Sequence, residues 1–118
     1  TPESVPAGAY GKESLTYYKL WDALSPKFVY GKDVKQVMTY VETGDAEAGI
    51  VYATDAKQAK NSFVAQVLSA KSHSPILYSS AVISSSTYQK SAQKFLDYLK
   101  EKKAQAVFKK YGFSVLKK

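Results

Sequence analysis

The chain has 118 residues, of which 45% are hydrophobic and none is cysteine, so it allows one domain with a modest core and excludes disulfides and thiol chemistry. Its net charge of +7 comes from residues 90–118, which hold nine lysines and two acids, whereas residues 1–89 are neutral. Every residue with a cationic side chain is lysine, and none is arginine, which binds guanine and phosphate through two hydrogen bonds in one plane. We therefore predict that the lysines form a solvated helical face and bind no nucleic acid. Lysine-mediated binding of anionic polymers is the alternative.

The first predicted helix begins near Ala9 and ends at residues 25–26, where Ser-Pro disfavours helical backbone. Two prolines and a glycine before Ala9 predict a start that is extended and then turned. The buried side of this helix is predicted to carry Leu15, Tyr18 and Trp21. Residues 27–30 predict a short strand before Gly31.

The most informative pattern runs from Asp33 to Ala56. Asp33 and Gln36 have the spacing of a capping box, and Gly44 is placed to end the helix in a left-handed conformation. Between them, one helical face carries the apolar residues Val34, Val37, Met38 and Val41. Residues 48–53 predict a buried strand, and residues 54–55 predict the start of another helix. This order predicts an α/β layer, in which helix N-termini lie beside strand ends and bind anions without a charged side chain.

The remainder of the chain predicts two strands, at residues 63–68 and 76–83, and then two helices. The apolar stripe of the first helix is Ala92, Phe95, Leu96 and Leu99. The stripe of the second is Ala104, Val107, Phe108 and Tyr111. Gly112 is expected to end the second helix.

Four stretches, taken in order, resemble one protein family. They are PESVPAGAYGKESL, LWDALSPKFVYGKDVKQVMTYVETGDAEAGIVYATDA, HSPILYSSAVI and AQKFLDYLKEKKAQAVFKKYGF. They are similar to the second half of periplasmic molybdate-binding proteins, the solute receptors of molybdate and tungstate ABC importers. The resemblance implies an α/β, type 2 periplasmic-binding-protein fold and a chain that is a fragment of a two-lobe receptor. Residues 1–70 would form the second ligand-binding lobe, and residues 71–118 would form a crossover strand and C-terminal helices that return to the first lobe.

The resemblance also implies three ligand-binding positions. Ala7 and Val34 correspond to residues whose backbone N–H groups bind the oxyanion, and Tyr52 corresponds to a tyrosine whose hydroxyl donates to it. Neutral donors at helix N-termini supply partial positive charge to a dianion without a lysine. Without the resemblance, Val34 would be interpreted as a core residue of its helix and Tyr52 as a packing residue at a strand end.

The implied function is that of the solute-binding component of an ABC transporter, which captures molybdate or tungstate in an interlobe cleft and delivers it to a membrane permease. The implied location is the periplasm or the extracellular face of the cytoplasmic membrane. A ligand-sensing regulatory or enzymatic module that reuses the fold is the alternative. Since the C-terminal stripes would pack partly against a lobe that this chain lacks, we expect the isolated chain to self-associate.

Neither catalysis nor a bound cofactor is predicted. His73 is the only histidine, and it lies in a polar loop where surface exposure or a hinge hydrogen bond is expected. Asp33 is interpreted as a helix cap because no histidine or acid lies at a metal-ligand spacing from it, so the only metal expected is the one in the oxyanion. Glu42, Asp45 and Glu47 cluster at a turn and are interpreted as solvated acids.

Overall fold

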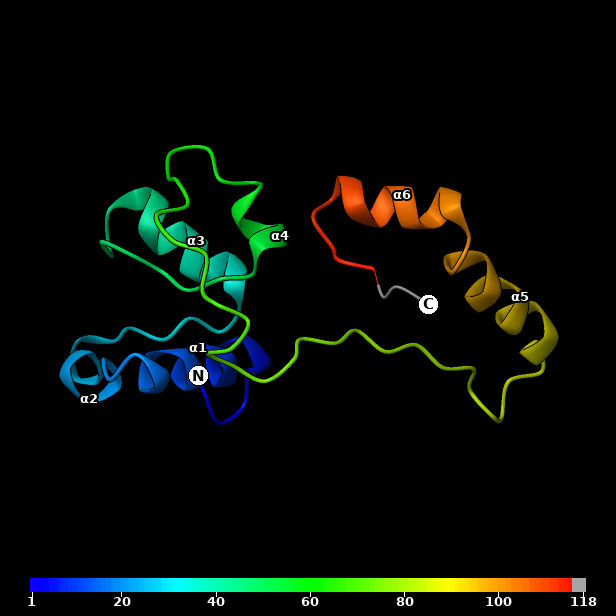
Figure 1. Ribbon diagram of the computed structural model, residues 1–118, viewed down its shortest axis with the longest axis horizontal. Helices are drawn as coiled ribbons and strands as arrows, with labels where there is room; N and C mark the ends of the chain where they lie inside the picture. Colours follow the sequence, from blue (N-terminus) through cyan, green and yellow to red (C-terminus); the bar gives the residue numbers. More distant parts are fainter. Residues whose placement is uncertain (116–118) are drawn as a thin grey trace. The chain divides into compact units, whose positions relative to one another are not determined.

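The structure is a computed structural model in which residues 1–115 are described, and the chain divides into two compact units with the boundary between Pro75 and Ile76. The helices of the first unit are α1 (Pro6–Tyr17), α2 (Trp21–Leu24), a 3-10 turn (Ser25–Lys27), α3 (Val34–Thr43) and α4 (Ala53–Ala56) (Figure 1). Those of the second unit are α5 (Gln89–Leu99) and α6 (Lys102–Lys110). No helix within residues 1–115 is both long enough and apolar enough to cross a membrane.

The first predicted helix differs from the structure at its start and in its middle. It starts at Pro6 instead of Ala9, because proline suits the first helical position, where no intrahelical acceptor exists for an N–H. It is also broken after Tyr17, because Lys19 adopts a left-handed conformation with φ 60°. The N–H groups of Lys19 and Leu20 donate to the carbonyls of Thr16 and Leu15, at 2.9 and 2.8 Å, which is a Schellman ending. The prediction of one helix up to Ser25 is therefore wrong.

Helix α3 confirms the prediction made from its caps. The Asp33 carboxylate accepts the N–H of Gln36 at 2.8 Å, and the Gln36 side chain accepts the N–H of Lys32 at 2.8 Å. The reciprocal bond of the capping box thus reaches one residue further back than Asp33 itself. At the other end, Gly44 has φ 80° and ends the helix as expected.

The four predicted strands are wrong for this structure, since residues 1–115 form no strand. A strand persists only where a neighbouring strand satisfies its N–H and C=O groups, and a single sequence cannot show whether that neighbour is present. Several apolar side chains of these segments stay open to solvent, as in Phe63, which is 87% exposed, and Ile83, which is 71% exposed. The α/β class is accordingly not confirmed, although the predicted helices at α3, α5 and α6 are confirmed.

A loop close to the end of the first unit is fastened to α1. Ser14 is fully buried, and its hydroxyl lies 2.9 Å from that of Ser72, which donates in turn to the carbonyl of Ser69 at 2.6 Å. The N–H of Ser74 donates to the Glu13 carboxylate, and the His73 ring lies 5.9 Å from that of Tyr10. These contacts hold residues 69–74 on α1. His73 belongs to this loop and is half-buried.

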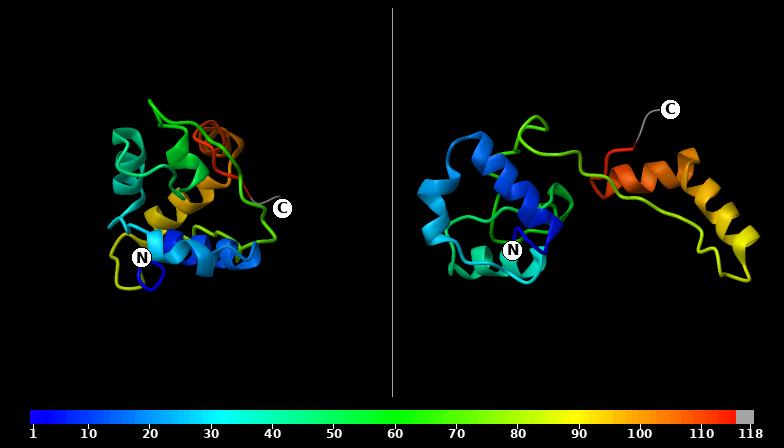
Figure 2. Two further views of the ribbon diagram at one scale, coloured as in Figure 1. Left: turned by 90° about the vertical axis from the view of Figure 1, so that its left-hand side faces the viewer. Right: turned by 90° about the horizontal axis from the view of Figure 1, so that it is seen from below.

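The second unit confirms both C-terminal helices, which are joined by a bend at Glu101 (Figure 2). Gly112 has φ 95° and ends α6, with the N–H of Phe113 donating to the carbonyl of Phe108 at 3.0 Å. Ala104 is the one buried member of the predicted stripes. Phe95 and Tyr111 are each 60% exposed, whereas Leu96, Leu99 and Phe108 are half-buried, so each stripe is open to solvent only in part.

Candidate functional site

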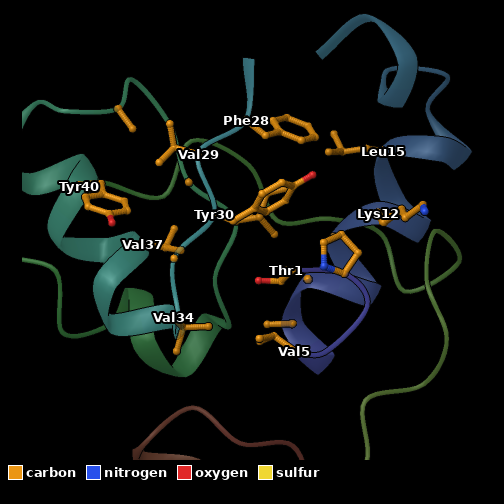
Figure 3. Close-up of a pocket in the computed structure, with 18 of the residues that line it drawn as sticks. Thr1, Val5, Lys12, Leu15, Phe28, Val29, Tyr30, Val34, Val37 and Tyr40 are labelled. Carbon is orange, nitrogen blue, oxygen red and sulfur yellow. The ribbon is translucent and has the colours of Figure 1, made fainter. Parts of the chain in front are cut away.

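A cavity of about 320 Å³ lies in the first unit (Figure 3). Its walls come from α1, α2, α3 and the irregular segments before and after α3. The lining is mainly apolar and aromatic, and among its members are Leu15, Trp21, Phe28, Tyr30, Val37, Tyr40 and Ile50. A concave, mostly apolar space with a few convergent polar groups is the usual form of a small-ligand site.

Two of the three predicted ligand-binding residues line this cavity. Ala7 is the second residue of α1 and is 9% exposed, and Val34 is the first residue of α3 and is half-buried. The start of α1, marked by its N-cap Val5, faces Val34 across the cavity (Figure 3). First-turn N–H groups have no acceptor inside their own helix. Within residues 1–115 no hydrogen bond joins the N–H of Ala7 or of Val34 to another group.

The third predicted residue, Tyr52, is not among the residues that line the cavity. It is the half-buried N-cap of α4, with extended backbone at φ −72° and ψ 151°. Its carbonyl accepts the N–H groups of Asp55 and Ala56, each at 3.0 Å. Since α3 and α4 pack against each other, Tyr52 belongs to the helix next to the one that carries Val34. Of the three predicted positions, the structure brings Ala7 and Val34 to one cavity.

The polar groups of the cavity are mostly neutral. Lys12 is the one lysine in its lining, and the Nζ of Lys12 lies 5.1 Å from the centre of the Trp21 ring, a cation–π distance. Asp33 is the one acid in the lining, and its carboxylate is engaged in capping α3. Within residues 1–115, no group of three or more histidine, cysteine or acidic side chains is arranged to hold a metal ion. The N–H groups in the first turns of α1 and α3 are neutral donors in this lining that could bind an anion.

One polar contact of α3 was missed by the sequence analysis. Glu42, interpreted there as solvated, accepts the N–H of Lys60 at 2.6 Å and the N–H of Asn61 at 3.4 Å through one carboxylate oxygen. These backbone bonds, with a smaller contribution from the charge of Lys60, hold the pKa of Glu42 below its usual value. The partners lie 18 and 19 residues along the chain, so no local spacing signals this contact.

Comparison with known proteins identifies relatives over almost the whole chain. A sequence profile described as bacterial extracellular solute-binding protein matches residues 1–114. YvgL of Bacillus subtilis, named as a candidate substrate-binding lipoprotein of an ABC transporter, is 52% identical over 114 residues, which are 97% of this chain and 44% of YvgL. The molybdate-binding protein ModA of Escherichia coli is 40% identical over 114 residues, again 97% of this chain and 44% of the relative.

One solved structure has a backbone similar to that of this chain. It is the substrate-binding domain of a candidate molybdenum ABC transporter from Clostridium difficile, and it superposes with a TM-score of 0.84 at 38% identity. The match covers 99% of this chain and 51% of that domain. The chain thus spans about half the length of the proteins that it matches.

Proposed function

This chain belongs to the family of bacterial extracellular solute-binding proteins, and from this premise we propose that it forms one half of the binding component of an ABC importer for molybdate or tungstate. The resemblance found in the sequence is confirmed at the level of the family. The names of the relatives, two of which mention molybdate or molybdenum, support the choice of cargo. Because the chain spans 44% of its curated relatives, a binding cleft with two walls needs residues beyond it.

The proposed fold of the complete receptor is the α/β, type 2 periplasmic-binding fold. In it, residues 1–70 form the second lobe, and residues 71–118 form the crossover strand and the returning helices. The segments predicted as strands become strands when the remaining half supplies their neighbours. The TM-score of 0.84 over 99% of the chain supports this proposal, since the backbone follows the path of a substrate-binding domain.

The proposed site consists of the backbone N–H groups of Ala7 and Val34 and the hydroxyl of Tyr52. The observation that carries it is that the first turns of α1 and α3 both line one cavity, with no hydrogen bond to either N–H within residues 1–115. A hydrogen bond to a charged group contributes about 1.5–3 kcal/mol, so three such donors give useful affinity without a cationic clamp. The molybdenum or tungsten is part of the cargo, and the proposal includes no cofactor and no catalytic step.

The proposed partner is an ABC permease in the membrane, to which the receptor delivers the oxyanion from the periplasm or the outer face of the membrane. The alternatives of a regulatory module, an enzyme or a binder of anionic polymers gain no support from the relatives, two of which are named for ABC transporters. The isolated chain is proposed to self-associate through the exposed members of the α5 and α6 stripes, such as Phe95 and Tyr111. Light scattering on the isolated chain tests that association.

The function is tested by titrating molybdate and tungstate into the full-length receptor in a calorimeter. Tyr52→Phe should weaken binding by about tenfold, because one hydrogen bond to a charged ligand is lost. Tyr40→Phe is the matched control, since Tyr40 lines the cavity but is not assigned as a donor. A receptor that binds neither oxyanion would overturn the proposed function, and equal losses in the two variants would overturn the assignment of Tyr52.

A further inference from the structure

Glu42 occupies a place in α3 that local helix energetics do not favour. It lies in the last turn of the helix, Val34–Thr43, where the carbonyl end of the macrodipole repels a carboxylate. Its oxygen instead receives the N–H groups of Lys60 at 2.6 Å and Asn61 at 3.4 Å. A residue that breaks a local rule usually serves a non-local contact, and here that contact joins α3 to the segment after α4.

The segment that Glu42 holds is continuous, by hydrogen bonds, with Tyr52. The carbonyl of Tyr52 accepts the N–H of Ala56 at 3.0 Å, and the carbonyl of Ala53 accepts the N–H of Lys57 at 3.3 Å. The N–H of Ala59 then donates to the carbonyl of Ala56 at 3.2 Å. Residues 52–59 therefore form one hydrogen-bonded block that begins at Tyr52 and ends next to the residue that Glu42 holds.

The chain just before this block also contacts α3. A Cβ at Gly49 would lie only 2.8 Å from Cγ1 of Val37 and 3.0 Å from Cγ2 of Val41, so the segment before Tyr52 lies directly against the helix. Helix α3 thus touches the chain before and after the block, and the same helix carries Val34 at its first position. These two attachments add to the direct packing of α4 on α3, so the segment around Tyr52 contacts this helix along its length.

We propose that Glu42 is a positioning residue of the binding site, which fixes Tyr52 relative to the N–H of Val34 by holding the α4 block on α3. This inference rests on the proposed function, because it takes the hydroxyl of Tyr52 and the N–H of Val34 as donors to one oxyanion. Loss of the Glu42 carboxylate frees the far end of the block, and Tyr52 then loses its fixed distance from Val34. Glu42 touches no ligand and acts only through Tyr52.

The attachment itself is tested by amide hydrogen exchange on the chain, without any ligand. Glu42→Ala should accelerate exchange at Lys60 and Asn61 by about tenfold, because the acceptor of both amides is gone. Glu42→Gln should keep both amides protected, since an amide oxygen also accepts hydrogen bonds. Glu47→Ala is the control, because Glu47 is exposed and its substitution removes the same negative charge. Equal exchange in Glu42→Ala and the unchanged chain would overturn the proposal.

The positioning role is tested by a double-mutant cycle on the full-length receptor, titrated with sodium molybdate. Glu42→Ala should weaken binding by about fivefold in the unchanged receptor and should have no further effect in the Tyr52→Phe background, since coupled residues are not additive. Glu42→Gln should restore the affinity. An additive loss in both backgrounds would overturn the proposal by showing a general loss of stability. Normal binding by Tyr52→Phe would overturn it together with the assignment of Tyr52, while the exchange experiment would still report on the attachment.

Discussion

Replacing Val34 with proline removes the proposed amide donor while leaving the helix intact. Proline is favoured at the first helical position, and Val34 occupies that position in α3. The residue before a proline must have extended backbone, and Asp33 already has φ −153° and ψ 172°. The bond from the N–H of Gln36 to the Asp33 carboxylate, at 2.8 Å, is also unaffected by the change. Val34→Pro is therefore expected to fold with α3 intact.

The expected cost to binding follows from the lost donor. One hydrogen bond to a charged group contributes about 1.5–3 kcal/mol, which corresponds to roughly tenfold to a hundredfold in affinity. Val34→Ala keeps the N–H and should bind within about threefold of the unchanged receptor, so it separates the amide from the side chain. Calorimetric titration of the full-length receptor with molybdate measures both variants, and circular dichroism checks the helix. Normal binding by Val34→Pro would refute the assignment of a backbone donor at this position.

Three further outcomes follow from contacts in the first unit. Gly49→Ala should lower the free energy of unfolding in urea titrations by about 1–3 kcal/mol, because the new Cβ overlaps Val37. Gly11→Ala, which lies inside α1 and whose Cβ would meet Ile50 at an ordinary 3.5 Å, should raise it by about 0.5–1 kcal/mol, and the opposite order would contradict the packing of α3. Because the pKa of Glu42 is lowered in the folded chain, its contribution to stability is complete above the usual pKa of 4.5 and is lost as the pH falls through the lowered pKa. Glu42→Gln should therefore lose less stability on acidification, and pH profiles identical to those of the unchanged chain would contradict this. The isolated chain should bind molybdate far more weakly than the full-length receptor because half of the cleft is absent, and sub-micromolar affinity of the chain by calorimetry would disprove it.

Local signals were enough to predict several elements of the fold. Asp33 and Gly44 mark the two ends of α3, and each acts through groups within three or four residues of itself. Gly112 ends α6 in the same way. The family could be identified because several such stretches occur in a fixed order, and this also led to Ala7 and Val34, which line one cavity.

Contacts between distant residues could not be predicted. Each predicted strand depended on a neighbour, and no neighbour is paired with it within residues 1–115. The break of the first helix at Lys19 escaped notice because a lysine with positive φ carries none of the signal that a glycine would. The bond between Glu42 and Lys60 and the contact between Ser14 and Ser72 join residues 18 and 58 positions apart, and nothing in their local sequence indicates them.

The most direct test of the account is to follow the backbone amides of Ala7 and Val34 by nuclear magnetic resonance while molybdate is added to the full-length receptor. Both N–H groups are proposed to donate to the same oxyanion, so their resonances should move together and saturate along the calorimetric binding curve. An amide of α5, such as that of Ala92, should stay in place as the control. Saturable molybdate binding that leaves the resonances of Ala7 and Val34 unmoved would contradict the account.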